Sequence, residues 1–188
     1  YSSAASDVYK RQCLGLITGF RLSFADGRGT QGRFTTTVDF ASHCLTSMLR
    51  LGRVELQGVG SRFHYKDFAR LGNGLTFPDD QAALLHRYFA HMLYRKDLLL
   101  HESVWLSQKL MLMYWGLVRW YAVGHSVARG EADVSLGAME EAVRSVELHY
   151  AFHTTFSKIF ENAPTLGLVL DSIVKRPGFA ASMICGAG

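Results

Sequence analysis

The chain has 188 residues, of which 48% are hydrophobic, 12% aromatic and 19% charged, and its net charge is +4. Ample hydrophobicity with little net charge excludes an intrinsically disordered chain, and three distant cysteines, Cys13, Cys44 and Cys185, exclude a disulfide scaffold. The small net charge argues against a nucleic-acid partner. No apolar run approaches the roughly 20 residues of a membrane-spanning helix, so we expect no membrane span. Sparse cysteines that form no even-numbered framework favour a reducing compartment, the cytoplasm.

The first twelve residues have a different origin from the rest of the chain. Residues 2–12, SSAASDVYKRQ, match the in-frame translation of a transposase-type sequencing-library adapter. We therefore interpret residues 1–12 as an adapter-derived artefact and exclude them from fold reasoning, as one excludes a cloning scar. This interpretation predicts a truncated metagenomic fragment whose true N-terminus and upstream domain are missing.

The N-terminal third has the two-residue periodicity of β-strands. Apolar residues alternate with polar ones over 19–40, and glycines supply a turn, so we expect a β-hairpin there. Residues 40–51 predict a short helix. Residues 53–68 alternate again and suggest a second short hairpin, which Gly58 and Gly60 weaken.

From Pro78 onward the apolar spacing becomes helical. Three long helices are predicted, over about 78–99, 101–128 and 135–162, followed by a short one over 166–175. The second is apolar on nearly every side, which is typical of a central helix, and Leu110, Trp115 and Val118 are its expected core residues.

The predicted fold class is therefore mainly α with a small β portion (α+β). A β-hairpin-containing segment over 13–77, ending in a glycine-punctuated connector over 69–77, precedes a helical bundle over 78–176, and an apolar tail covers 177–188.

One pair of histidines has the spacing of metal ligands. His149 and His153 are four residues apart, so one helical face could present both imidazoles, and Glu147 could supply a carboxylate. These three residues are our candidate metal ligands, for a metal-dependent enzyme. The alternative is purely structural, with His153 at the edge of the core and His149 on the surface.

Aromatic and methionine side chains on the second predicted helix could line an apolar pocket, because helical bundles host ligands between their helices. Trp115 and Tyr150 are our pocket candidates, between the second and third predicted helices; ordinary core packing is the alternative. The glycines do not form a phosphate-binding GxGxxG or GxxxxGK pattern, and there is no GxSxG nucleophile motif. The sequence therefore names no catalytic residue and no cofactor-binding residue.

From about residue 82 to 176 the order of features resembles the C-terminal helical part of the YkgJ-type cysteine-cluster family, which includes proteins like flagellin lysine-N-methylase. The segments that carry the resemblance are LLHRYFAHMLYRKDLL (84–99), LMLMYWGLVRWYAVG (110–124) and MEEAVRSVELHYAFHTTF (139–156). The matching points are Arg87-Tyr88-Phe89, Arg119, and Val143, Val146, Glu147 and His149.

The resemblance implies a cysteine cluster that binds a metal or an iron–sulfur centre in the missing upstream part, and no cofactor within this chain. For relatives of the methylase it also implies methyl transfer to lysine in a protein substrate. The expected partners are then the missing N-terminal domain and possible protein substrates.

Two functions therefore stay open. The first is a non-catalytic helical module of a truncated cysteine-cluster or lysine-methylase-like protein, which packs against the absent metal-binding domain. The alternative is a ligand-binding helical effector domain of a regulator. We do not expect this chain alone to catalyse a reaction, whereas the full-length protein could be a methyltransferase-like enzyme, and the oligomeric state is open.

Overall fold

The computed structural model of the chain describes residues 52–56, 58–72, 75–95 and 104–151, together with the single residues Leu45, Leu49, Ser172 and Lys175. Several predictions lie outside these residues: the hairpin over 19–40, most of the helices over 40–51 and 166–175, the end of the third long helix and the tail.

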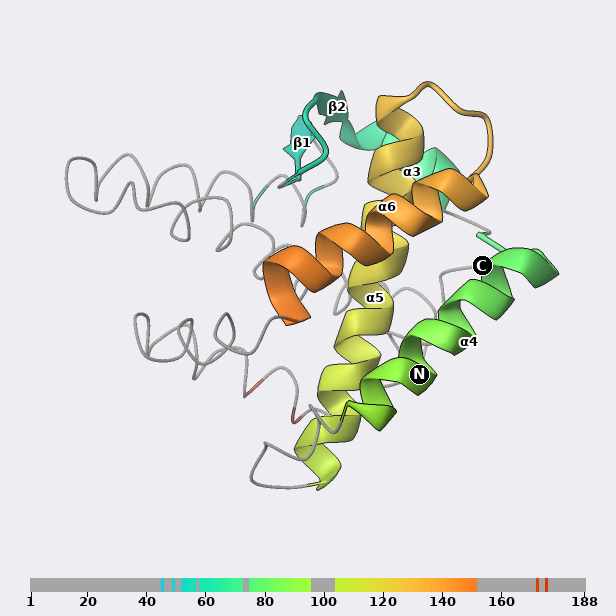
Figure 1. Cartoon of the computed structure of the whole chain (residues 1–188). Helices are drawn as coiled ribbons and strands as arrows, with labels where there is room; N and C mark the ends of the chain where they lie inside the picture. The colour runs from blue at the N-terminus through green and yellow to red at the C-terminus, as the bar shows by residue number, and fades with distance from the viewer. Residues whose placement is uncertain are drawn as a thin grey trace.

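The described part is mainly helical with one small antiparallel sheet, so the predicted α+β class is confirmed. Helix α5 runs through the middle of this part, and α6 crosses α5. The hairpin and α3 lie near the C-terminal end of α5 (Figure 1). No helix among the described residues is long and apolar enough to cross a membrane. The elements in chain order are β1 (Arg53–Glu55), β2 (Arg62–His64), α3 (Tyr65–Gly72), α4 (Asp79–Tyr94), α5 (Val104–Ala128), α6 (Leu136–Val146) and the π-helical turn η2 (Glu147–Ala151).

The hairpin predicted over 53–68 forms, and its glycines are part of the reason. β1 and β2 are antiparallel, with Val54 opposite Phe63. Between them Gly58 and Gly60 have φ values of 82° and 76°, a left-handed conformation that other residues adopt only with strain. The glycines that weaken a strand interpretation are thus the residues that let the chain reverse.

The second half of that prediction is wrong. From Tyr65 the chain is helical, where the sequence suggested a strand and then a connector. Tyr65 continues the alternation that includes Phe63, but it is also three residues before Phe68, and both are buried on one face of α3. Phe68 packs on Trp120 of α5 with ring centroids 4.5 Å apart, and this tertiary contact favours the helical spacing.

Helix α5 supplies more of the core residues than any other described element, as its apolar surface predicts. Leu110 is 6% exposed and Val118 is fully buried, so two of the three expected core residues are confirmed. Trp115 is only half-buried and packs at the edge of the core. The core extends without a break from Val54 in β1 to Tyr150 in η2, so the hairpin and the helices share one interior.

Helix α6 begins at a serine cap and is followed directly by a π-helical turn. The Ser135 hydroxyl accepts a hydrogen bond from the backbone N–H of Ala138 at 3.2 Å, which satisfies one of the free N–H groups of the first turn. Ser135 and Ser126 donate hydrogen bonds to Glu131, at 2.9 and 2.7 Å, and thereby fix the loop before the cap. The helix changes to π geometry at Glu147 instead of continuing as α-helix.

The hairpin approaches α5 most closely at Gly124. A Cβ atom at this position would lie 2.6 Å from Cδ1 of Leu56 and 3.4 Å from Cζ of Phe63. Both distances are shorter than ordinary contacts between packed carbon atoms. Leu56 is 2% exposed, so it has little space into which to move.

We therefore expect Gly124→Ala to lower the free energy of unfolding by about 1–3 kcal/mol through overpacking, despite the better helix propensity of alanine. Gly137→Ala is the matched control, because its new Cβ would lie 3.5 Å from the Arg129 guanidinium, an ordinary contact. Urea denaturation of both variants measures the difference. If the Gly124→Ala protein is as stable as the control, the hairpin does not approach α5 closely enough at Gly124 to exclude a methyl group.

Candidate functional site

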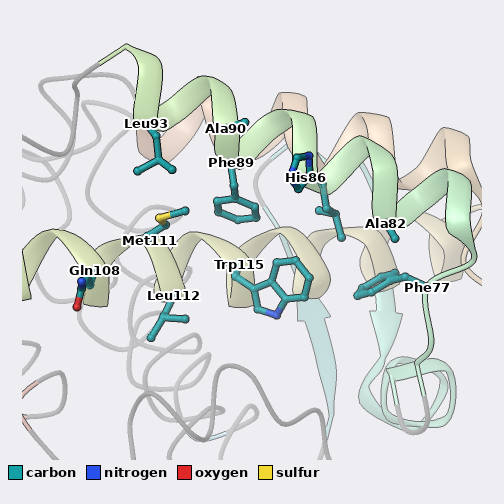
Figure 2. A pocket seen from close by; sticks show the side chains of 11 residues that line it. Phe77, Ala82, His86, Phe89, Ala90, Leu93, Gln108, Met111, Leu112 and Trp115 are labelled. Atoms are coloured by element: carbon teal, nitrogen blue, oxygen red, sulfur yellow. The ribbon is translucent and has the colours of Figure 1, made fainter.

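An apolar groove of about 740 Å³ lies between α4 and α5, open on one side. Figure 2 shows its side chains in two rows, Ala82 to Leu93 on α4 and Gln108 to Trp115 on α5, with Phe77 beside Ala82 at one end. The complete lining is Phe77, Ala82, Leu85, His86, Phe89, Ala90, Leu93, Gln108, Met111, Leu112 and Trp115.

The groove exists because α4 packs closely on α6 and less closely on α5. The backbones of α4 and α6 meet, whereas α4 reaches α5 mainly through large side chains. Phe89 and Trp115 bridge the two helices, with ring centroids 5.6 Å apart. Ala82 and Ala90 fill little of the remaining space, so the volume beside the aromatic contact stays empty.

A hydrogen bond fixes the beginning of α4 against the loop before α6. Nε2 of the buried Gln81 donates to the backbone carbonyl of Val134 at 2.7 Å. At the other end of α4, the Arg95 guanidinium pairs with both carboxylate oxygens of Glu147, at 3.1 and 3.2 Å. These two contacts hold α4 to the α6 side and leave its α5 side open.

The chemistry of the groove is almost entirely apolar. Among the described lining residues, the polar side chains are His86, near the middle of α4, and Gln108, near Leu93 at one end. Beyond the other end, the guanidinium of the buried Arg119 lies 5.3 Å from the centre of the Phe77 ring, a cation–π contact that orders this ring. Such a surface can bind an apolar molecule and offers few hydrogen bonds to it.

A second cluster of chemically capable side chains lies under the hairpin turn. His125 Nε2 is 3.1 Å from the Ser145 hydroxyl, and the hydroxyls of Tyr121 and Tyr150 are 2.9 Å apart. All four side chains are at most 7% exposed. The π-helical turn places Tyr150 in this cluster, and such turns are frequent at functional sites. Because these groups are buried, the cluster holds α5, α6 and η2 together and is closed to a substrate in this structure.

Two of the three candidate metal ligands, Glu147 and His149, lie against different neighbours. Glu147 turns to Arg95 of α4. His149 turns the other way, and its Nε2 would lie 3.0 Å from a Cβ added at Gly58 of the hairpin turn. His153 lies outside the described residues. Within the described ranges there is no group of three or more histidine, cysteine, aspartate or glutamate side chains that could hold a metal ion.

The two pocket candidates also lie apart. Trp115 lines the groove, whereas Tyr150 is buried against Tyr121, and the groove lies between the first and second long helices, not the second and third. The sequence missed Ala82, Ala90 and Gln108. The signal that could have found the two alanines is the small size of their side chains, which leaves a gap in the apolar face of α4 at Ala90, next to Phe89, and again two turns earlier at Ala82.

Comparison of the chain with protein-family models, with curated proteins and with solved structures finds no match. The function must therefore be argued from the geometry of the chain itself.

The buried imidazole of His125 makes stability depend on pH. Burial lowers its pKa, and the positive charge of Arg129 lowers it further, against the opposing effect of Glu141. The unfolded chain then binds this proton more readily than the folded one. The contribution of His125 to stability is therefore complete above its ordinary pKa of about 6.5 and is lost as the pH falls toward the lower folded value.

We expect the stability advantage of the natural protein over His125→Gln to shrink between about pH 8 and about pH 5.5. Denaturation of both proteins across this range is the measurement. His64→Gln, on the exposed end of β2, is the matched control because its imidazole is not buried. The same pH trend in both variants would show that His125 carries no burial penalty.

Proposed function

We propose that the described part of the chain binds an apolar small molecule in the groove between α4 and α5. The observation that carries the proposal is the combination of volume and lining: about 740 Å³, walled by Phe77, Phe89, Trp115, Met111 and aliphatic side chains, with two polar groups. Ligand pockets of proteins are typically 300–1,000 Å³, mostly apolar, with a few polar groups that orient the ligand.

A ligand in this position would displace water from both helices at once. Its apolar surface would leave water together with the exposed parts of Phe89 and Trp115, which gives the driving force. Because the site joins α4 to α5, an occupied groove resists separation of the two helices. Binding to the folded chain alone also raises the apparent stability.

This proposal corresponds to the effector domain of a regulator, in which ligand binding is transmitted to another part of the protein. Helix α4 is a suitable transmitter because Arg95 and Gln81 connect its two ends to η2 and to the loop before α6. A change in the distance from α4 to α5 would therefore act on α6 as well. A cytoplasmic location, which the sparse use of cysteine favours, suits such a role.

The helical module of a cysteine-cluster, lysine-methylase-like protein stays a prediction from the resemblance. It is decided by the gene sequence upstream of residue 13 in an unbroken assembly. Four or more closely spaced cysteines would support it, and continuous coding sequence without them would contradict it.

Filling the groove tests the binding proposal. Ala90→Leu adds three carbon atoms to the groove wall, and we expect it to weaken the binding of the uncharged fluorophore N-phenyl-1-naphthylamine at least about tenfold, because the ligand loses apolar burial. Fluorescence titration gives the dissociation constants. The matched control is Ala83→Leu, which makes the same change at an exposed position of α4 outside the lining.

The fluorophore should bind the natural protein and the Ala83→Leu variant equally. Equal binding by the Ala90→Leu variant as well, or no binding by the natural protein, would overturn the proposal. Thermal unfolding of both variants checks that the fold is retained.

A further inference from the structure

We propose that the ligand of the groove is a linear aliphatic chain with one uncharged polar end, which lies along α4 and α5 with that end at Gln108. This inference rests on the proposed function and specifies the chemical class of the ligand. Three features of the groove carry it: its length, its lack of charge, and the difference between its two ends.

The groove is long because its walls follow two helices. On α4 the lining extends from Ala82 to Leu93, and at a rise of 1.5 Å per residue these positions are about 16 Å apart along the helix. The α5 wall runs in the opposite sense, with Trp115 opposite Phe89 and His86, and Gln108 toward the Leu93 end (Figure 2). The α5 lining from Gln108 to Trp115 is shorter, about 10 Å along the helix. A compact ring system would fill only part of such a groove, whereas an extended chain can contact both walls over this distance and continue along α4 toward Ala82.

Among the described residues that line the groove, none is an aspartate, glutamate, lysine or arginine. Arg95, at the end of α4, pairs with Glu147 outside this lining. An ionised group within the groove would lose its hydration without gaining a charge partner, which is costly. The body of the ligand is therefore uncharged.

The two ends of the groove differ in polarity. At one end Phe77 and Trp115 meet with ring centroids 5.8 Å apart, and both are half-buried. At the other end the Gln108 side chain is exposed and offers both a donor N–H₂ and an acceptor carbonyl. An aliphatic end is thus matched to the aromatic pair, and a hydroxyl or amide end is matched to Gln108, where it can also keep contact with water.

The test is a series of unbranched primary alcohols, from hexanol to tetradecanol, that compete with bound N-phenyl-1-naphthylamine on the full chain. Each added methylene is expected to tighten binding about fourfold, until the chain fills the groove and the affinity levels off. Carboxylic acids of equal length should compete less well, because Gln108 offers no positive charge.

Variants of the groove residues locate the bound alcohol within the groove. Ala90→Leu should make the affinity level off at a shorter alcohol, whereas Ala83→Leu should leave the length dependence unchanged. Gln108→Leu should reduce the preference for an alcohol over a carboxylic acid of the same length, while Trp115 and its neighbours still bind the aliphatic part.

The outcomes separate the two proposals. If the fluorophore does not bind at all, the proposed function fails. If it binds but alcohol affinity is independent of length, if naphthalene competes better than the longest alcohols, or if acids compete as well as alcohols, then the proposed function stands and this inference is wrong. If fluorophore binding is lost as the protein concentration rises, the groove is covered by a second copy of the chain. This result would also overturn the inference.

Discussion

The burial of α5 is the constraint on which the described structure depends. This helix is apolar on nearly all sides, so it needs partners around its whole circumference. The hairpin and α3 cover its C-terminal half, where Gly124 lets Leu56 come close and Trp120 packs against Phe68 with the rings tilted. Helix α6 crosses it and has the most extensive contact with it among the described elements. The remaining side faces α4, and there the described residues cover it incompletely.

That incomplete cover follows from competition between two interfaces. Helix α4 buries Leu85, Tyr88 and Met92 against the common core, and its ends are tied to the loop before α6 and to η2. Burial, together with the negative charge of Glu147, raises the pKa of Tyr88, so this phenol stays neutral in the interface. Because α4 is fixed in this way, the small side chains of Ala82 and Ala90 face a gap that no neighbouring described helix closes.

Much of this architecture could be predicted from the sequence, because its local signals agree with the tertiary structure. Pro78 and the two aspartates after it mark the beginning of α4, Ser135 marks the beginning of α6, and the apolar surface of α5 predicts its central place. The helical character of α3 could not be predicted with the same ease, because Phe63 and Tyr65 fit a strand equally well. It is the contact between Phe68 and Trp120, distant in sequence, that decides between them.

The candidate site depends even more on distant contacts. The sequence indicated that Trp115 lines a pocket, but it could not show which helix forms the opposite wall, because that depends on the pairing of Arg95 with Glu147 across 52 positions of the chain. The same pairing also turns Glu147 away from His149, although the two are close in sequence. The periodicity of apolar residues in the sequence shows which face of a single helix is buried, but a groove depends on how two helices are placed relative to each other.

The π-helical turn at Glu147–Ala151 has a consequence for how this chain tolerates insertions and deletions. A π-turn contains one residue more than the α-helical turn it replaces, so it changes the direction in which its last side chains, Tyr150 among them, leave the helix. Removing a single residue here would shorten the chain very little, yet it would carry the Tyr150 hydroxyl away from that of Tyr121 and bring a different side chain into the core. The register of this part of the protein is thus set by the length of one turn, and natural variants that lose a residue there would need a compensating change in the surface of α5.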